Sequence, residues 1–280
     1  MKYCLIDSGN QLKLEQFGPY RLVRPCAQAF WKPSLEKALW DGADAFFTRE
    51  NGNRWTASKE MPTSWQIELE GILLKIAPTD FGHLGVFPEH QLLWGWMKDK
   101  MAKVSFTPSL LNLFAYSGAA TLALAKAGAQ VCHVDASKGM VAWARENAKI
   151  NGLSSAPIRW IVDDVVKFLQ REIRRGVTYD GILLDPPSFG RGASGEVFKM
   201  ENDFLLLLET CRKLLSQGAL FFLVSSHTAG MSPMVMHHVM EQQMKGFAGT
   251  IESGEMIIPS TRSVALPCGS FARWSSCNKK

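Results

Sequence analysis

From Pro108 onward the sequence repeats one pattern: a short, continuously apolar segment, one or two polar residues, and then an amphipathic segment. Apolar segments such as SLLNLF, GILLD and ALFFLV are typical of parallel strands that helices cover on both faces. We predict strands at residues 110–114, 130–134, 158–162, 179–184 and 219–224, each followed by a helix. Residues 109–280 are therefore predicted to form a doubly wound, Rossmann-like α/β domain.

The first third of the chain has a different pattern, in which short strand-like segments are separated by turn residues. The pairs Asn51-Gly52 and Glu70-Gly71 fit tight hairpin turns, which need positive φ. Residues 1–78 are therefore predicted to form a small, mostly antiparallel β domain with a helix near residues 34–40. Residues 79–108 are predicted to be a linker that continues into a helix, which begins at Pro88 because proline suits the first helical turn.

Composition places the chain among globular proteins, because 46% of its 280 residues are hydrophobic and 20% are charged. No segment approaches the roughly 20 apolar residues of a membrane span, and the amino terminus lacks a signal-peptide pattern. We therefore expect a cytoplasmic protein with no membrane partner. The six cysteines form no C-x-x-C pair and the six histidines no metal-ligand spacing, so no metal site is predicted. The sequence does not indicate an oligomeric state.

In a doubly wound sheet, ligands bind outside the carboxyl ends of the strands, so the residues after each apolar segment are the site candidates. They are Ser117 and Gly118 after the first predicted strand, Asp135 after the second, Asp163 and Asp164 after the third, and Asp185, Pro186 and Pro187 after the fourth. Free amides at a helix start can hold an anionic carboxylate. Asp135 lies 23 residues after Asn112, a spacing that suits an acceptor for ribose hydroxyls.

Each of these residues also has a structural interpretation. A Ser-Gly pair after a strand is often only a turn, and Asp135, Asp163 or Asp164 could cap the following helix. The functional interpretation depends on the whole set, because the polar strand ends converge on one crevice.

The segment AYSGAATL distinguishes between two nucleotide cofactors. An NAD-dependent enzyme needs G-x-G-x-x-G, so that the backbone can approach a pyrophosphate, and this segment has one glycine where that motif has three. A cofactor with an adenosine but no phosphates needs the ribose acceptor without the glycine-rich turn. S-adenosylmethionine (SAM) fits that description.

Three segments carry a specific resemblance: LNLFAYSGAATLALAKAGAQVCHVDASKGMVAWARENAKINGL, IVDDVVKFL and YDGILLDPPSFGRG. They resemble the class I SAM-dependent methyltransferases, in particular the group that modifies large-subunit ribosomal RNA at cytosine C5 or guanine N7. Residues 5–31 resemble the leading segment of a bacterial subgroup, with no counterpart of the PUA module that many cytosine enzymes carry.

The resemblance implies roles for the residues that match family motifs. The methionine part of SAM would lie in a loop made by Phe114, Ala115, Tyr116, Ser117 and Gly118, with Ser117 at its carboxylate. The adenosine part would be held by Asp135 at the ribose, Ala136 near the adenine and Asp164 at the adenine amino group. Asp185, Pro186 and Pro187 would lie beside the reactive methyl group, and residues 79–108 would close over the cofactor.

The resemblance also bears on which atom is methylated. Cytosine C5 enzymes attack the base with a cysteine thiolate, because a ring carbon is a poor nucleophile, and in the family that cysteine follows the fifth strand. This chain has Ser225, Ser226 and His227 there. The sequence therefore favours a ring nitrogen such as guanine N7, which already has a lone pair. His227 could hydrogen-bond a base or cap the next helix.

The segment FGRGASGEVFK is predicted to be a flexible lid over an RNA target, or merely a mobile loop. As a lid it would bring Arg191 and Lys199 to the RNA and stack Phe189 or Phe198 on a splayed base. Residues 109–280 carry +4 of the net charge of +5, so RNA contacts are expected chiefly there. The hypothesis is SAM-dependent methylation of a base of RNA, with ribosomal RNA as the target. Methylation of a protein or small molecule, and a non-catalytic RNA-binding assembly factor, remain alternatives.

Overall fold

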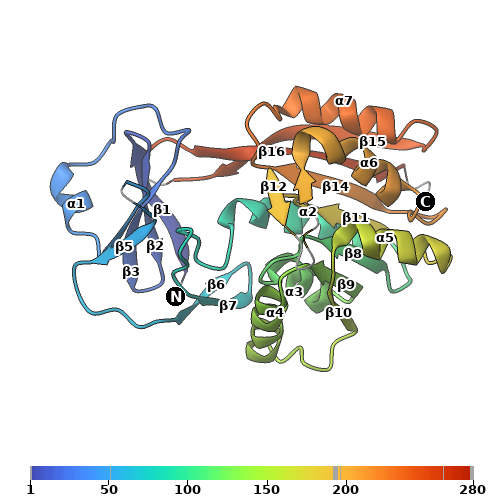
Figure 1. Cartoon of the computed structure of the whole chain (residues 1–280), viewed down its shortest axis with the longest axis horizontal. Coiled ribbons are helices and arrows are strands. Elements are labelled where there is room, and N and C mark those ends of the chain that lie inside the picture. The colour runs from blue at the N-terminus through green and yellow to red at the C-terminus, as the bar shows by residue number, and fades with distance from the viewer. Residues whose placement is uncertain (1, 51, 192–194, 196, 261, 278–280) are drawn as a thin grey trace. The chain divides into compact units, whose positions relative to one another are not determined.

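The computed structural model describes residues 2–50, 52–191, 195, 197–260 and 262–277. The chain divides into two compact units, of which the first comprises Met1–Gln91 and Ile257–Cys268 and the second comprises Leu92–Met256 and Gly269–Lys280 (Figure 1). Each unit is described by itself below. Among the described residues, no helix is long and apolar enough to cross a membrane.

The first unit is built from short strands, as the turn pattern predicts. Its elements are β1 (Tyr3–Gly9), β2 (Leu12–Phe17), β3 (Tyr20–Pro25), α1 (Lys37–Asp41), β4 (Ala45–Thr48), β5 (Arg54–Ala57), β6 (Trp65–Leu69), β7 (Ile72–Ile76) and the 3-10 helix η1 (Pro88–His90). Strands β1 to β5 form one sheet in sequence order, antiparallel except between β3 and β4, and β6 pairs with β7 in a separate hairpin.

The turn between β6 and β7 has the backbone conformation that its Glu-Gly sequence predicts. Glu70 and Gly71 both have positive φ, 50° and 75°, which is the conformation that a tight hairpin turn requires. Asn51, the first residue of the other predicted turn, lies outside the described residues. The predicted β-rich character of this region is confirmed.

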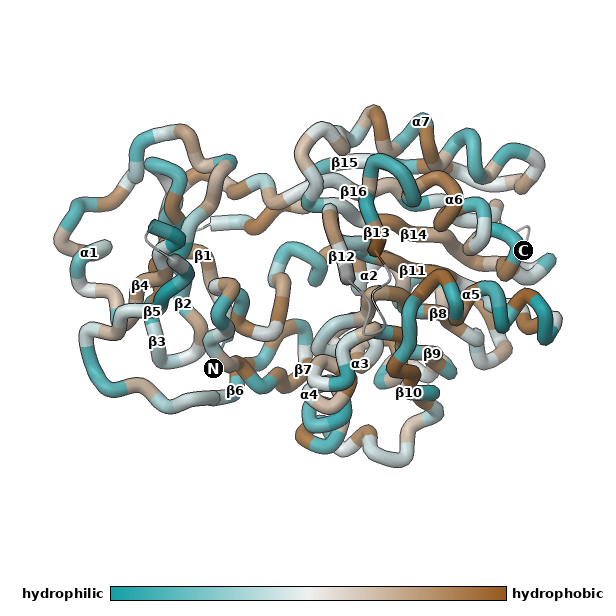
Figure 2. The backbone as a smooth tube through the Cα atoms, in the orientation of Figure 1, coloured by the Kyte–Doolittle hydropathy of each residue, from teal (hydrophilic) through white to brown (hydrophobic). Residues whose placement is uncertain are grey.

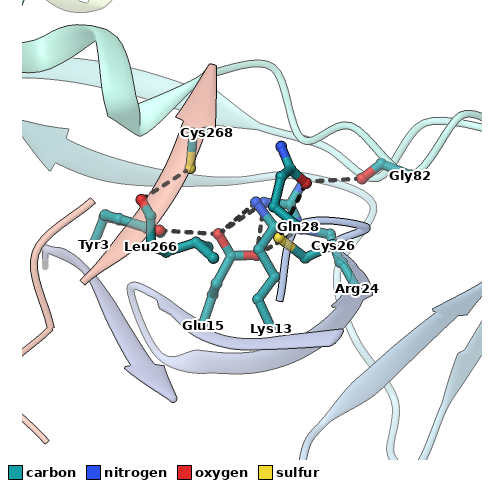
Figure 3. Close-up of polar contacts among 9 residues, drawn as sticks. All are labelled: Tyr3, Lys13, Glu15, Arg24, Cys26, Gln28, Gly82, Leu266 and Cys268. Atoms are coloured by element: carbon teal, nitrogen blue, oxygen red, sulfur yellow. Dashed lines mark hydrogen bonds and ion pairs between the residues drawn. The ribbon is translucent and has the colours of Figure 1, made fainter. Parts of the chain in front are cut away.

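The first unit encloses a buried charged cluster that the sequence did not indicate (Figure 3). The carboxylate of Glu15, fully buried on β2, accepts two hydrogen bonds from the Arg24 guanidinium, at 2.8 and 2.9 Å. Tyr3 donates its hydroxyl proton to the same carboxylate at 2.9 Å, and the Lys13 ammonium lies 3.3 Å away. Because the two cations and the tyrosine outweigh the cost of burial, the pKa of Glu15 is lowered. Glu15 is therefore ionised, and its carboxylate oxygens are occupied by Arg24, Tyr3 and Lys13, which indicates a structural role.

The second unit contains a seven-stranded sheet with helices on both faces. Its elements are α2 (Gln91–Met101), β8 (Ser109–Leu113), α3 (Ala119–Lys126), β9 (Gln130–Asp135), α4 (Lys138–Ile150), β10 (Ile158–Val162), α5 (Val165–Arg174), β11 (Gly181–Leu184), β12 (Phe189–Arg191), β13 (Val197–Lys199), α6 (Met200–Arg212), β14 (Phe221–Ser226), α7 (Pro233–Gln243), β15 (Gly249–Ile258) and β16 (Leu266–Ser276). The strand order is β10-β9-β8-β11-β14-β16-β15. The first five strands are parallel, and β16 runs antiparallel to β14.

The central strands are apolar throughout because both of their faces are covered. Every residue of β11 and of β14 is buried. Phe222 packs in one core with α5, α6 and α7, whereas its neighbour Phe221 faces Trp96 of α2 on the opposite side of the sheet. Helices α5 and α7, which cover the sheet, are amphipathic. In Figure 2 hydrophobic and hydrophilic residues alternate along both helices. The predicted doubly wound α/β fold is confirmed.

The sheet ends in a long antiparallel hairpin that the sequence did not predict. Strands β15 and β16 continue the sheet beyond β14, and residues Ile257–Cys268 at the tip of this hairpin belong to the first unit. There Ile258, Leu266 and Cys268 pack in a core with Leu5 and Cys26. The two strands thus supply residues to both units.

Candidate active site

The carboxyl ends of the parallel strands are aligned by their register. Leu113 of β8 pairs with Val134 of β9, and Leu184 of β11 pairs with both Leu113 and Val224 of β14. In the strand order β9 and β10 lie on one side of β8, and β11 and β14 lie on the other, which makes the gap between β8 and β11 the topological switch point where ligands bind in such folds. The predicted site residues follow these strand ends.

The loop after β8 is wound in an unusual way. Phe114, Tyr116 and Gly118 all have positive φ, at 54°, 51° and 85°, and the first two are not glycine. Such conformations cost of order 1–3 kcal/mol each and persist where the surroundings enforce them, which is typical of ligand sites. A side chain at Gly118 would also meet the Cβ of Ala144 at 2.8 Å, so glycine is required there for two reasons. The helix α3 begins directly after it, with its free amides at the same edge.

Asp135 fixes this loop from the neighbouring strand. Its Oδ2 accepts a hydrogen bond from the Tyr116 amide at 2.9 Å, and its Oδ1 accepts one from the Ser137 amide at 2.8 Å. Burial raises the pKa of Asp135, and these two amide bonds only partly offset the effect. A carboxylate offers about four lone-pair positions, so Asp135 retains acceptor capacity for a ligand. Ala136, the next residue, is partly exposed.

The two acids after β10 have different partners. Asp164 caps α5, since its Oδ1 accepts from the Lys167 amide at 2.9 Å, which is the structural interpretation that the sequence left open. Asp163 forms an ion pair with Arg171 of α5. The Asp163 amide donates to the Asp135 carbonyl, at 3.1 Å, so the ends of β9 and β10 are tied together.

Asp185, after β11, is connected to the end of β14. The Ser225 hydroxyl donates to its Oδ1 at 2.8 Å, and Nε2 of His227 lies 3.7 Å from its Oδ2. The ring of His227 packs against Gly269, where a Cβ would lie 3.2 Å from Nδ1. The loops are joined again by a hydrogen bond between Ser188 and Thr228, at 2.7 Å. Ser225 and His227 therefore hold the carboxylate of Asp185 from the adjacent strand.

The two prolines of this motif differ in exposure. Pro186 is buried and Pro187 is exposed. The ring of Pro187 lies against the following ribbon, 3.2 Å from the position that a Cβ on Gly190 would occupy. Pro186 is thus packed within the protein, whereas Pro187 is accessible to solvent.

The segment predicted as a lid contains a short two-stranded ribbon, β12 with β13, where Phe189 pairs with Lys199 and Gly190 with Phe198. Directly opposed residues point to the same face, so the two phenylalanines face opposite sides. Phe189 is 51% exposed, whereas Phe198 is buried in the core against Phe114. The expectation that Phe198 could stack on a base is wrong. Lys199 is exposed, and the side chain of Arg191 lies outside the described residues.

Sequence reasoning missed a set of buried polar side chains beneath the loop. Asn112 donates to the Thr121 hydroxyl, which bonds Nδ1 of His133, both at 2.9 Å. Burial lowers the pKa of His133 to about 3, so this histidine is neutral. Asn147 of α4 donates to the Ser117 carbonyl at 2.9 Å. The available signal was a polar residue within an apolar strand or helix face, as at Asn112 in SLLNL.

Fold and site together define a class: a doubly wound α/β domain with a glycine-poor loop and a row of acids at the strand switch point. The family model of the S-adenosylmethionine-dependent methyltransferases matches residues 44–252, and the chain belongs to this family. The resemblance to SAM-dependent methyltransferases noted in the sequence is confirmed, and S-adenosylmethionine is the cofactor of the family.

Relatives agree with this assignment. The crystal structure of the SAM-dependent methyltransferase from Agrobacterium tumefaciens is 44% identical, with a TM-score of 0.94 over 98% of this chain and 90% of that chain. A SAM-dependent methyltransferase from Streptococcus mutans, 20% identical with a TM-score of 0.76, shares the fold over 98% of this chain and 75% of its own. Ribosomal RNA large subunit methyltransferase K/L of Pseudoalteromonas translucida is 30% identical over 172 residues, which are 60% of this chain and 23% of that protein. The chain spans about a quarter of the length of such curated relatives.

Proposed function

We propose that this chain transfers the methyl group of SAM to a base of RNA, with ribosomal RNA as the target and a ring nitrogen as the acceptor. The target class is supported by the names of the curated relatives, ribosomal RNA large subunit methyltransferases K/L. The nitrogen is supported by one observation in the site: Ser225, hydrogen-bonded to Asp185, and Ser226 and His227 occupy the end of β14 and the position after it, where a cytosine C5 enzyme needs a cysteine.

The strand-end residues fit the cofactor. In this proposal the loop from Phe114 to Gly118 holds the methionine part of SAM, because the first amides of α3 can donate to its carboxylate. Asp135 accepts from the ribose hydroxyls with the lone pairs that the two amides leave over. Ala136 packs beside the adenine, and the oxygen of Asp164 that does not cap α5 accepts from the adenine amino group.

Bound SAM supplies an electrophilic methyl group on a sulfonium. The protein then has to orient the nucleophile, and we assign this to Asp185, Pro186 and Pro187. Side-chain contacts tie this segment to the end of β14: Ser225 and His227 contact the Asp185 carboxylate, and Ser188 bonds Thr228. A nitrogen lone pair forms the new bond directly, so no covalent bond between protein and base is needed. Phe189 stacks on the base, and Lys199 and Arg191 contact the phosphates.

The cysteines of the second unit's core do not replace the missing nucleophile. Burial raises the pKa of Cys132 to about 11 and raises that of Cys211 further, so both remain thiols at neutral pH. Burial also raises the pKa of Cys268, at the hairpin tip in the first unit. Attack on a ring carbon would require a thiolate.

Labelled methyl transfer tests the proposal. Purified chain is incubated with tritiated SAM and ribosomal RNA from cells that lack the gene, and the RNA is digested to nucleosides for mass spectrometry. We expect one nitrogen-methylated nucleoside, and none with Asp185→Ala. Appearance of 5-methylcytidine would contradict the nitrogen assignment. Label in the protein or small-molecule fraction would contradict the RNA assignment, and no transfer by a chain that binds S-adenosylhomocysteine would favour a non-catalytic assembly factor.

A further inference from the structure

Asn147 is a polar residue on the apolar face of α4. The helix buries Val141, Ala144, Asn147 and Ala148, and Asn147 is fully buried. Burying an amide is unfavourable unless it is hydrogen-bonded. An apolar residue would pack at this position without that requirement, so the use of asparagine points to what its amide contacts.

The amide of Asn147 reaches the loop after β8. Its Nδ2 donates to the carbonyl of Ser117 at 2.9 Å, across 30 residues of sequence. The amide of Gly118, in the same peptide plane as that carbonyl, donates to the Ala115 carbonyl at 3.1 Å. Because a peptide unit is planar, the two bonds together fix the orientation of the Ser117–Gly118 unit.

The three consecutive loop residues 116–118 are held by strand β9 and helix α4. Asp135 binds the Tyr116 amide, Asn147 binds the Ser117 carbonyl, and Ala144 packs against Gly118. Tyr116 has positive φ, which a residue other than glycine keeps only under such constraint. Removing the Asn147 donor would let the peptide rotate and would change the direction of the amides that begin α3.

We propose that Asn147 is a positioning residue for the cofactor: through the Ser117 carbonyl it keeps the loop in the conformation that receives the methionine end of SAM. The inference rests on the role given above to the Phe114–Gly118 loop. It does not depend on the identity of the methyl acceptor. It also predicts a specific asymmetry, because Asn147 acts on the methionine half of the site and Asp135 serves the adenosine half.

The test compares two ligands. S-adenosylhomocysteine carries the methionine-derived end, whereas adenosine lacks it, and calorimetry or ligand-observed NMR gives the dissociation constant of each. In Asn147→Leu, which keeps the size and removes the donor, we expect the dissociation constant for S-adenosylhomocysteine to rise about tenfold and that for adenosine to change less than twofold. Asp135→Ala should weaken both. Asn151→Leu is the matched control, since Asn151 caps the end of the same helix and its amide donates to the backbone carbonyl of Asn147, at 2.8 Å.

The outcomes separate this inference from the proposed function. Unchanged affinity for S-adenosylhomocysteine in Asn147→Leu overturns it, and so does an equal loss for both ligands, because that is the result of a merely structural role. A loss of the same size in Asn151→Leu overturns it as well. If Asn147→Leu does not fold, Asn147→Ala is measured in the same way. Failure of wild-type protein to methylate RNA would overturn the proposed function and leave these binding results unaffected.

Discussion

Fully buried and partly exposed carboxylates are held in different ways in this molecule. In the first unit, Glu15 is saturated by the cations Arg24 and Lys13 and by Tyr3. At the strand ends of the second unit, Asp135 is held by two backbone amides, and Asp185 by a serine hydroxyl beside a histidine. The pKa of Glu15 is lowered, whereas that of Asp135 is raised.

The difference follows location in the fold rather than the unit. Glu172, buried on α5 of the second unit, is bound by Arg159, Arg175 and Tyr179, and its pKa is lowered like that of Glu15. Glu15 and Glu172 are thus closed by cations, whereas Asp135 is oriented by backbone amides and Asp185 by a serine hydroxyl. The comparison teaches that partners and exposure together distinguish these acids: Glu15 and Glu172 are buried and paired with cations, whereas Asp135 and Asp185 are partly exposed, bound by neutral donors, and remain able to accept from a ligand.

The largest expected effect is a loss of stability when a charged partner of Glu15 is removed. Arg24→Met leaves Glu15 buried beside a single lysine, and removing one partner of a buried ion pair costs about 3–5 kcal/mol. Urea unfolding should show a loss of this order. Lys37→Ala, which breaks an exposed pair with Asp41, is the control and should change stability little. Equal effects of the two variants would show that the Glu15 cluster is not a structural centre.

Asp185→Asn should act on catalysis rather than on stability. An amide has one acceptor oxygen where the carboxylate has two, so residue 185 loses one of its two contacts with Ser225 and His227, and the segment that continues into Pro186 and Pro187 is held less firmly. We expect methyl transfer to fall about 100-fold, the cost of misplacing reacting groups, while S-adenosylhomocysteine binds within a few-fold of wild type. Single-turnover assays measure the first and calorimetry the second. Ser188→Ala, which breaks only the bond to Thr228, should lose less; the reverse order would be evidence against our assignment.

Asp135→Ala should weaken cofactor binding about tenfold to a hundredfold, because it removes a charged acceptor from the ribose and releases the Tyr116 amide. Calorimetry with S-adenosylhomocysteine measures the change. Asp163→Ala is the control, since Asp163 is already paired with Arg171. An equal loss in the control would mean that the ribose acceptor was assigned to the wrong strand.

The smallest expected effect is a loss of cofactor affinity at acidic pH. The pKa of Asp135 is raised, so its carboxylate is protonated and loses acceptor capacity at a higher pH than an ordinary aspartate. The pKa values of Glu15 and Glu172 are lowered, so their contribution to stability is lost only as the pH falls below the usual glutamate range. Affinity for S-adenosylhomocysteine should therefore fall several-fold on acidification before circular dichroism shows unfolding. Unfolding that precedes the loss of affinity would contradict the comparison, and Asp135→Ala should abolish this part of the pH dependence.

Sequence patterns predicted the five parallel strands, and in the central β11 and β14 burial on both faces leaves continuous apolar segments. They did not predict the β15–β16 hairpin. In β16 inward and outward residues alternate, but several inward positions carry small or polar residues such as Ser270 and Ala272, so the period of two is weak in hydrophobicity.

The site was predicted in part. Residues that follow apolar strands could be found from position alone, but partners distant in sequence could not. The bond from Asn147 to Ser117 and the cluster around Glu15 both depend on contacts that only the folded chain creates. Which of Phe189 and Phe198 faces outward depends on the register of the β12–β13 ribbon, which the glycine-rich sequence does not fix.

The hairpin tip has a consequence for synthesis on the ribosome. Residues Ile257–Cys268 complete the core of the first unit around Leu5 and Cys26, although the rest of that unit ends at Gln91. The first unit is therefore completed only after most of the second unit has been translated. Chains stalled or cleaved before this hairpin would expose Leu5 and its neighbours, so co-translational folding of the first unit should be late, contrary to the usual order of domains along a chain.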